Sequence, residues 1–264
     1  MFSQNSTYVK FIKNVNVEDI TTMNFKSSHE FNHIMDNVSK QQGQFYIERI
    51  EEEFPHIRYE DLRTFVNMND KYGNATKSIY EKDGKLLYSN PSNMRYMYFA
   101  LLILTNIVLC GNTDIVEIGA GYGGLFLAIN HFSQKLNIPV GTYTLIDLPE
   151  MNVITAKYLV AHKTAVSVPY TIVNANFIED RITGDNLYVV SNYCFTEIDS
   201  VFRDNYVRNL FPKVSHGFMA WQTCMNSGMN KENIAEVVRK PITKIEPERP
   251  QTGPAHSINY FVYI

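Results

Sequence analysis

The chain has 264 residues, with 45% hydrophobic residues, 19% charged residues and a formal net charge of −3 at pH 7. This composition is that of a globular protein able to bury a substantial core. A nucleic-acid-binding protein needs clustered basic residues, so no nucleic-acid partner is expected.

Three cysteines, Cys110, Cys194 and Cys224, lie far apart and show no C-x-x-C spacing. This pattern indicates a reducing compartment and argues against a zinc site or a disulfide framework. The first ten residues, MFSQNSTYVK, contain no apolar signal-peptide core. We therefore expect a cytoplasmic protein.

Residues 1–108 predict a helical N-terminal region, for which we expect a lid or substrate-binding role. Apolar residues at helical spacing predict helices at 17–37, 44–53 and 59–68. Asn90 and Pro91 fit the N-cap and first position of a further helix, which Gly111 ends. The apolar run of that helix, 96–110, is shorter than the roughly 20 residues that a bilayer requires. We expect a buried helix packed on a sheet, and no membrane partner.

Residues 109–264 alternate between strand and helix patterns, which predicts a Rossmann-like, doubly wound α/β domain with a mainly parallel sheet. The expected strands are 114–118, 142–147, 169–174, 187–192, 216–221, 241–246 and 257–263, and the expected helices lie near 123–136, 150–163, 197–210 and 231–239. The connection 247–256 has no room for a crossover helix. The seventh strand should therefore run antiparallel to the sixth.

The stretch DIVEIGAGYGG at 114–124 joins the first of these strands to an apolar helix. Glycines in such a turn let the backbone approach a nucleotide closely. Gly119, Gly121 and Gly124 fit the dinucleotide pattern G-x-G-x-x-G. Gly119, Gly121 and Gly123 equally fit the E-x-G-x-G-x-G pattern of S-adenosylmethionine (SAM) methyltransferases.

Three observations favour SAM as the cofactor. Glu117 would repel a pyrophosphate, whereas methyltransferases use an acid at this place near the methionine amino group. None of the 17 tyrosines has a lysine four residues later, as short-chain dehydrogenases require. A seven-stranded sheet with an antiparallel last strand is the methyltransferase layout. Asp147, at the end of the second strand, is expected to hold ribose hydroxyls in either class.

At these residues the chain resembles the sugar O-methyltransferases, a branch of the class I SAM-dependent methyltransferases. The similar stretches are VEIGAGYGG at 116–124, LIDLPEM at 145–151, SNYCFTEID at 191–199, YGN at 72–74 and SNPSNMRYMY at 89–98. The resemblance covers about residues 70–264. It implies methyl transfer to a hydroxyl of a nucleotide-linked or glycan sugar. A non-sugar acceptor such as a phenol, and a non-catalytic SAM-fold binding protein, remain alternatives.

The ligand of an open α/β sheet sits at the carboxyl ends of the strands. Two candidate general bases for a hydroxyl proton are expected at this edge, Glu197 and His256. The alternative for Glu197 is purely structural: with Thr196 as an N-cap, an acid in the first helical turn stabilises the helix dipole. The further cofactor-binding residues expected at this edge are Leu148, Asn176, Ser191 and Asn192.

Arg95 is placed by the direction of its helix. That helix delivers the chain to the start of the first strand, so its own beginning should lie near the cofactor edge, where Arg95 can bind the SAM carboxylate. The pair Asp199 and Asp204 is a poor match to the closely paired acids of metal-dependent methyltransferases, so no metal is expected. The sequence leaves a monomer and a homo-oligomer equally open.

Overall fold

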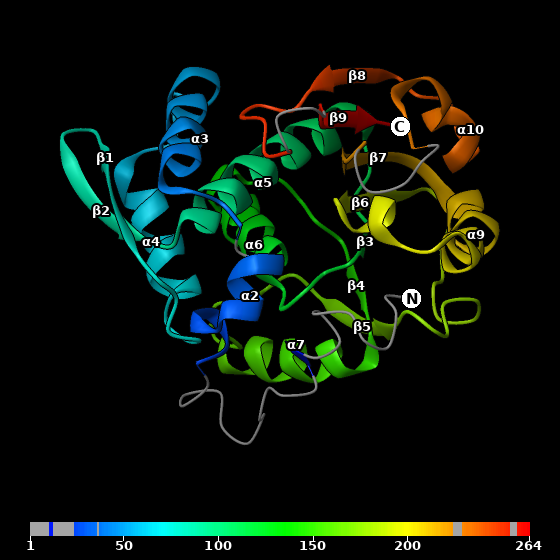
Figure 1. The fold of residues 1–264 in the computed structure, drawn as a ribbon, viewed down its shortest axis with the longest axis horizontal. Coiled ribbons are helices and arrows are strands. Elements are labelled where there is room, and N and C mark those ends of the chain that lie inside the picture. Colours follow the sequence, from blue (N-terminus) through cyan, green and yellow to red (C-terminus); the bar gives the residue numbers. More distant parts are fainter. Residues whose placement is uncertain (1–10, 13–23, 36, 224–228, 254–257) are drawn as a thin grey trace.

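The computed structural model describes residues 11–12, 24–35, 37–223, 229–253 and 258–264. Its centre is a seven-stranded sheet with the order β5-β4-β3-β6-β7-β9-β8 (Figure 1). The strands are β3 (Ile115–Ile118), β4 (Tyr143–Asp147), β5 (Tyr170–Asn174), β6 (Leu187–Asn192), β7 (Val214–Trp221), β8 (Lys244–Pro247) and β9 (Tyr260–Tyr263). Strands β3 to β7 are parallel, and β9 runs antiparallel between β7 and β8. The expected α/β fold with an antiparallel last strand is confirmed.

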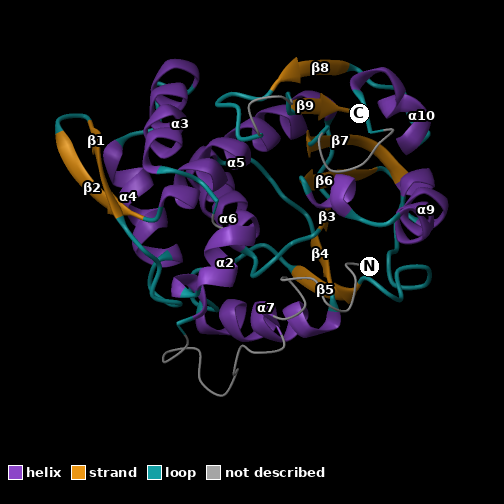
Figure 2. Cartoon of the chain, in the orientation of Figure 1, coloured by secondary structure: helices purple, strands orange, loops and turns teal. Residues whose placement is uncertain are grey.

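Helices cover both faces of this sheet (Figure 2). Side chains of successive strand residues point to opposite faces, so Ile115 joins one apolar core and Val116 the other. The first core lies under α5 (Pro91–Cys110), α6 (Gly124–Leu136) and α7 (Pro149–Ala161), with α3 (Lys40–Glu53) and α4 (Tyr59–Asn69) outside them. The second lies under α9 (Ser200–Asn209) and α10 (Ile234–Val238). The first core includes residues from both sides of position 108.

Helix α5 is the buried helix that the sequence predicts. The side chain of Asn90 accepts a hydrogen bond from the backbone N–H of Ser92, Pro91 is the first helical residue, and Gly111 ends the helix at φ 69°. By length and composition α5 could cross a membrane, but most of its apolar stretch is buried inside the fold. The ring of Phe99 packs 5.7 Å from that of Phe218 on β7, which confirms packing against the sheet.

The N-terminal part differs from the sequence prediction in two places. The expected helix 17–37 falls partly outside the described residues, and within them Ser28 caps a short helix, α2 (His29–Ile34), because its hydroxyl accepts a hydrogen bond from the N–H of Phe31. The structure also contains a hairpin of β1 (Ser78–Lys82) and β2 (Lys85–Ser89), a region for which no strands are expected from the sequence.

Candidate active site

The turn after β3 requires glycine at two positions. Gly119 has φ 79°, and a Cβ there would lie 2.3 Å from Sγ of Cys194. Gly121 has φ 55°, and a Cβ there would lie 2.3 Å from Cε of Met35. Residues other than glycine rarely adopt such positive φ values, and neither position has space for a side chain. The side chains of Cys194 and Met35 therefore lie close to the backbone of the turn, and a ligand could approach the same backbone as closely.

Two adjoining pockets open at the carboxyl edge of the sheet, beside this turn. The predicted catalytic residue Glu197 lines the larger pocket. Six predicted cofactor-binding residues line it as well: Arg95, Glu117, Gly119, Gly121, Asp147 and Asn192. The smaller pocket is mostly apolar and contains Leu148 and Asn176, next to Ile146, Ile198, Phe202 and Tyr206. Gly119 and Asp147 line both pockets, so we call the two together the cleft.

Two predicted site residues do not line the cleft, and a third lies outside the residues that the structure describes. Gly123 caps α6 at φ 92° and does not line either pocket. Ser191 is fully buried, and its hydroxyl donates to the carbonyl of Ile118 at 3.1 Å while accepting from the N–H of Phe195. The hydroxyl therefore uses its one donor within the fold. His256 lies outside the described residues.

Glu117 is a buried acid in the wall of the cleft. Its side chain is 2% exposed, and the hydroxyl of Tyr143 donates to Oε2 at 2.8 Å. Burial raises the pKa of Glu117 to about 8, against the opposing effect of the Tyr143 hydrogen bond. The carboxyl group is therefore largely protonated at neutral pH until a cationic group comes close to it.

Asp147 ends β4 and fixes the glycine turn. Its Oδ2 accepts from the N–H of Gly121 at 2.8 Å, and its Oδ1 accepts from the N–H of Leu148 at 2.7 Å. Asp147 also lines both pockets, so its carboxylate adjoins the space in which a ligand would bind. The sequence predicts the ligand role of Asp147, and the structure adds the role in the turn.

Glu197 occupies a short helix that the sequence does not predict. The helix expected near 197–210 is confirmed as α9 (Ser200–Asn209), but it starts three residues later, because the chain first forms one turn, α8 (Cys194–Glu197), and becomes extended at Ile198. Thr196 is not an N-cap, because it lies inside α8 and its hydroxyl donates to the carbonyl of Tyr193 at 2.6 Å. The break leaves Glu197 at the end of α8, lining the cleft.

The amide of Gln222 holds this carboxyl group. Gln222 Nε2 donates to Glu197 Oε1 at 2.8 Å, and both side chains line the cleft. Burial raises the pKa of Glu197, and the bond from Gln222 opposes the rise. An acid with a raised pKa in a cleft is suited to exchange a proton with a bound group.

Arg95 lies in the cleft, as the direction of α5 predicts. It is 7% exposed, and its two terminal nitrogens donate to the carbonyl of Met35 and to Oδ1 of Asn37, each at 3.1 Å. Its guanidinium lies over the ring of Tyr193, 5.5 Å from the ring centre. These contacts join the beginning of α5 to the end of α2 above the glycine turn.

Asn192 has an unmatched acceptor in the cleft. Its Oδ1 is buried and accepts no hydrogen bond from the described residues. A buried acceptor without a partner is costly, which indicates a donor supplied by a ligand or by water.

Sequence reasoning missed several residues of the cleft. Gln222 follows the carboxyl end of β7, so the rule that places Glu197 could have found it. Met35, Asn37 and Tyr96 reach the cleft from the helical region, and no local pattern in the sequence indicates that approach.

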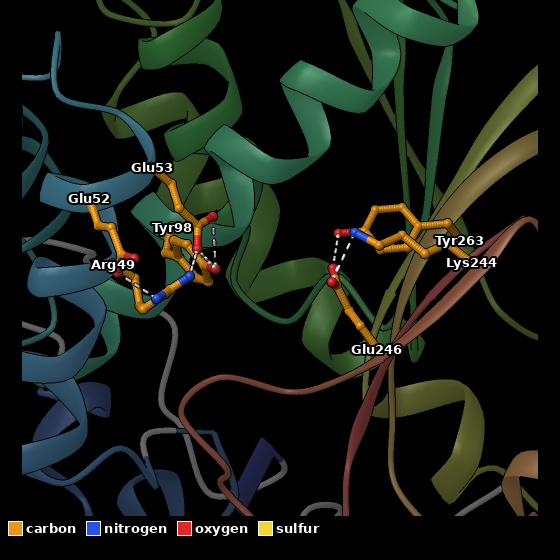
Figure 3. A network of polar contacts seen from close by, with 7 residues as sticks. All are labelled: Arg49, Glu52, Glu53, Tyr98, Lys244, Glu246 and Tyr263. Carbon is orange, nitrogen blue, oxygen red and sulfur yellow. Dashed lines mark hydrogen bonds and ion pairs between the residues drawn. The ribbon is translucent and has the colours of Figure 1, made fainter.

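A second cleft lies between α3, α5 and the β8–β9 edge, and two groups of polar side chains line it (Figure 3). On one side Glu53 pairs with Arg49 and accepts from the hydroxyl of Tyr98 at 3.1 Å. On the other side Tyr263 donates to Glu246 at 3.1 Å. The residues predicted to form the site do not line this cleft, and the charges in each group are paired.

No family model and no curated protein matches the chain. Among solved structures, it is similar to magnesium protoporphyrin IX methyltransferase from Synechocystis PCC 6803, with 8% identity over 65% of this chain and 80% of that chain and a TM-score of 0.46. An S-adenosylmethionine-dependent methyltransferase from Clostridium acetobutylicum ATCC 824 shows 9% identity over 64% and 90%, with a TM-score of 0.45. The citrinin polyketide synthase CMeT domain shows 15% identity over 66% and 53%, with a TM-score of 0.46. Values this low decide neither the cofactor nor the acceptor of this chain.

Proposed function

We propose that the chain is a SAM-dependent O-methyltransferase whose acceptor is a sugar hydroxyl. The observation that carries the proposal is the meeting of the glycine turn, Glu117 and Asp147 in one cleft at the carboxyl edge of the sheet. SAM combines an adenine, a ribose and an amino-acid group, and the cleft offers a matching group for each.

The residues of the cleft fit the parts of SAM. The apolar pocket beside Ile146 and Phe202 suits an adenine ring, and the carboxylate of Asp147 suits ribose hydroxyls. At the other end Glu117 suits the ammonium group and Arg95 the carboxylate. A dinucleotide fits less well, because its pyrophosphate offers no ammonium group that could pair with Glu117.

Catalysis requires the cleft to orient an acceptor oxygen and to take its proton. Bound SAM supplies the electrophilic methyl group. Glu197 accepts the hydroxyl proton, and Gln222 keeps one carboxyl oxygen fixed so that the other can turn toward the acceptor. Asn192 Oδ1 accepts a hydrogen bond from a bound donor. The resemblance to sugar methyltransferases in SNYCFTEID lies in this same segment.

A polar acceptor suits the polar groups that the cleft presents, namely Asn37, Asn192, Glu197 and Gln222. A sugar offers several hydroxyls to such groups. A phenol is the second candidate acceptor, because the rings of Tyr96 and Tyr193 also line the cleft and could stack on an aromatic acceptor.

Mass spectrometry after incubation with SAM tests the proposal. The protein is offered a panel of nucleotide sugars and, separately, a panel of phenols, and a mass gain of one methyl group is sought together with S-adenosylhomocysteine. We expect a methylated sugar. A methylated phenol alone would contradict the sugar assignment, and SAM binding without any turnover over broad panels would favour a non-catalytic binding protein.

A further inference from the structure

Tyr193 connects the cleft to a carboxylate outside it. Its ring lies under the guanidinium of Arg95, and its hydroxyl donates to Oε1 of Glu248. Glu248 is 1% exposed and does not line the cleft. The mechanism proposed above gives this buried acid no task, although it lies one side chain away from Arg95.

The backbone of Tyr193 is held in an unusual conformation. Its φ is 65° and its ψ is −31°, a region that a bulky residue adopts only when its surroundings impose it. Its N–H donates to the carbonyl of Ala220 at 2.9 Å, and its carbonyl accepts from the hydroxyl of Thr196. Strain of this kind concentrates at functional sites, and here it directs the ring toward Arg95.

Glu248 is itself fixed from several sides. Its Oε2 accepts from the backbone N–H of Thr252 at 3.1 Å and from Nδ2 of Asn259 at 3.0 Å. The hydroxyl of Thr252 also donates to it. A carboxylate held by these bonds also fixes the hydroxyl group that donates to it, which is that of Tyr193. The position of the Tyr193 ring therefore depends on Glu248.

We propose that Glu248 and Tyr193 are positioning residues that hold the Arg95 guanidinium for the carboxylate of an amino-acid ligand group. The inference rests on the proposed function, because SAM supplies that carboxylate. The flat ring supports one face of the guanidinium and leaves its edge to form hydrogen bonds. That edge now donates to Met35 and Asn37. A bound carboxylate offers it a charged acceptor instead.

Calorimetry with two ligands tests this role. S-adenosylhomocysteine carries the amino-acid group, whereas 5′-methylthioadenosine keeps the adenosine and the sulfur but lacks that group. Tyr193→Phe keeps the ring and removes the hydroxyl that binds Glu248. We expect it to raise the Kd of S-adenosylhomocysteine about five- to tenfold and to change the Kd of 5′-methylthioadenosine less than about twofold.

Three further variants complete the test. Glu248→Ala should give the same pattern and add no further loss when combined with Tyr193→Phe. In an Arg95→Met background neither change should have any additional effect. Tyr263→Phe is the matched control, because it removes a hydroxyl bond to a carboxylate, Glu246, outside the cleft (Figure 3). It should leave both Kd values unchanged.

Two results would overturn the positioning role. One is equal weakening of both ligands by Tyr193→Phe and by Glu248→Ala, which is the result of general damage to the cleft. The other is an unchanged Kd for S-adenosylhomocysteine in both variants. If the wild-type protein binds neither S-adenosylhomocysteine nor 5′-methylthioadenosine, the proposed function itself is contradicted. The wild-type titration therefore separates failure of the proposed function from failure of the positioning role.

Discussion

Asp147 and Glu117 are both acids of the cleft, but their surroundings differ. Asp147 accepts two backbone N–H bonds. Glu117 accepts a single hydroxyl bond in a buried place, and its pKa rises to about 8. The sequence predicts both residues as SAM ligands from their positions at strand ends. It could not predict the raised pKa of Glu117, because burial by other segments causes it.

The raised pKa of Glu117 predicts that SAM binding depends on pH. Below about pH 8 the free protein holds a proton on Glu117, and pairing with the SAM ammonium group requires its release. Affinity should therefore rise with pH by up to about tenfold per unit as far as pH 8, above which the α-amino group of the ligand loses its own proton. Calorimetry in buffers of different ionisation enthalpy should show proton release on binding. Glu117→Gln should abolish the release, and wild-type binding without it would contradict the assignment.

The same shift affects folding stability with the opposite sign. The pKa of Glu117 is raised above its ordinary 4.5, so its contribution to stability is fully present below pH 4.5 and declines as pH rises to about 8. Relative to Glu117→Gln, the free wild-type protein should lose stability over this interval. Denaturant unfolding at several pH values measures the difference, and a constant difference would show that the acid is not protonated in the fold.

Asp147→Ala should reduce both ligand affinity and stability. It removes charge-assisted bonds to ribose hydroxyls, a loss on the order of 2–3 kcal/mol in binding. It also leaves the N–H groups of Gly121 and Leu148 without their acceptor, which should cost about 1–3 kcal/mol of unfolding free energy. Calorimetry and denaturant unfolding measure the two losses separately. Lower stability with wild-type SAM affinity would leave Asp147 only its role in the turn.

Glu197→Gln should lower kcat by ~10²–10⁴-fold with little change in SAM affinity, because glutamine cannot accept the proton. Steady-state kinetics with the identified acceptor, beside a melting temperature, measure this. A rise in KM larger than the fall in kcat would indicate that Glu197 orients the acceptor instead. Unchanged turnover would remove it from the mechanism, and a large kcat loss in His256→Gln would assign the base to His256.

The hydrogen bond from Gln222 allows the role of Glu197 as general base to be tested by the pH dependence of kcat. Gln222→Met removes the bond that opposes the raised pKa of Glu197, so that pKa should rise further. Activity needs the ionised base and is lost as pH falls, so the acidic limb of kcat should move to higher pH. Gln134→Met is the control. It removes an exposed hydrogen bond from a glutamine amide to Ser167, outside the cleft, and should leave the pH profile unchanged. A profile unaffected by Gln222→Met would contradict the role of Glu197 as base.

At the scale of elements, strands were easier to predict than short helices and hairpins. The seven strands of the main sheet start within three residues of their expected positions, the largest differences being at β8 and β9. Buried apolar runs such as residues 187–190 give a strong signal. The break between α8 and α9 was missed, because Ile198 turns into the apolar pocket through tertiary packing. The β1–β2 hairpin was missed because exposed Ile79 and Tyr88 obscure its alternation.

Helix α5 connects the helical region with the sheet and carries Arg95, so its beginning should be sensitive to its cap. Asn90→Ala removes the bond to the N–H of Ser92 and a further bond to the carbonyl of Thr76. We expect a loss of about 0.5–2 kcal/mol in unfolding free energy. Urea unfolding should show a lower midpoint with an unchanged slope. An unchanged midpoint would show that tertiary packing alone fixes the start of α5.

At the scale of the whole molecule, the strand order decides where the site lies. Parallel strands β3, β4, β6 and β7 end at one edge, and this edge brings together residues that are up to about a hundred positions apart in the chain. The sequence predicts this edge of the cleft because the alternation of elements implies it. The opposite wall, formed by α2 and the start of α5, depends on packing between segments without a repeating pattern. The division of the chain at residue 108 stays a prediction.

A calorimetric titration of the 264-residue chain with S-adenosylhomocysteine and, in parallel, with NADH tests the proposed cofactor most directly. Both ligands contain an adenosine, but only the first carries an ammonium group that can pair with the buried acid Glu117 beside the glycine turn. We expect one S-adenosylhomocysteine bound per chain and no measurable binding of NADH. Tight binding of NADH, or no binding of S-adenosylhomocysteine, would contradict the proposed cofactor.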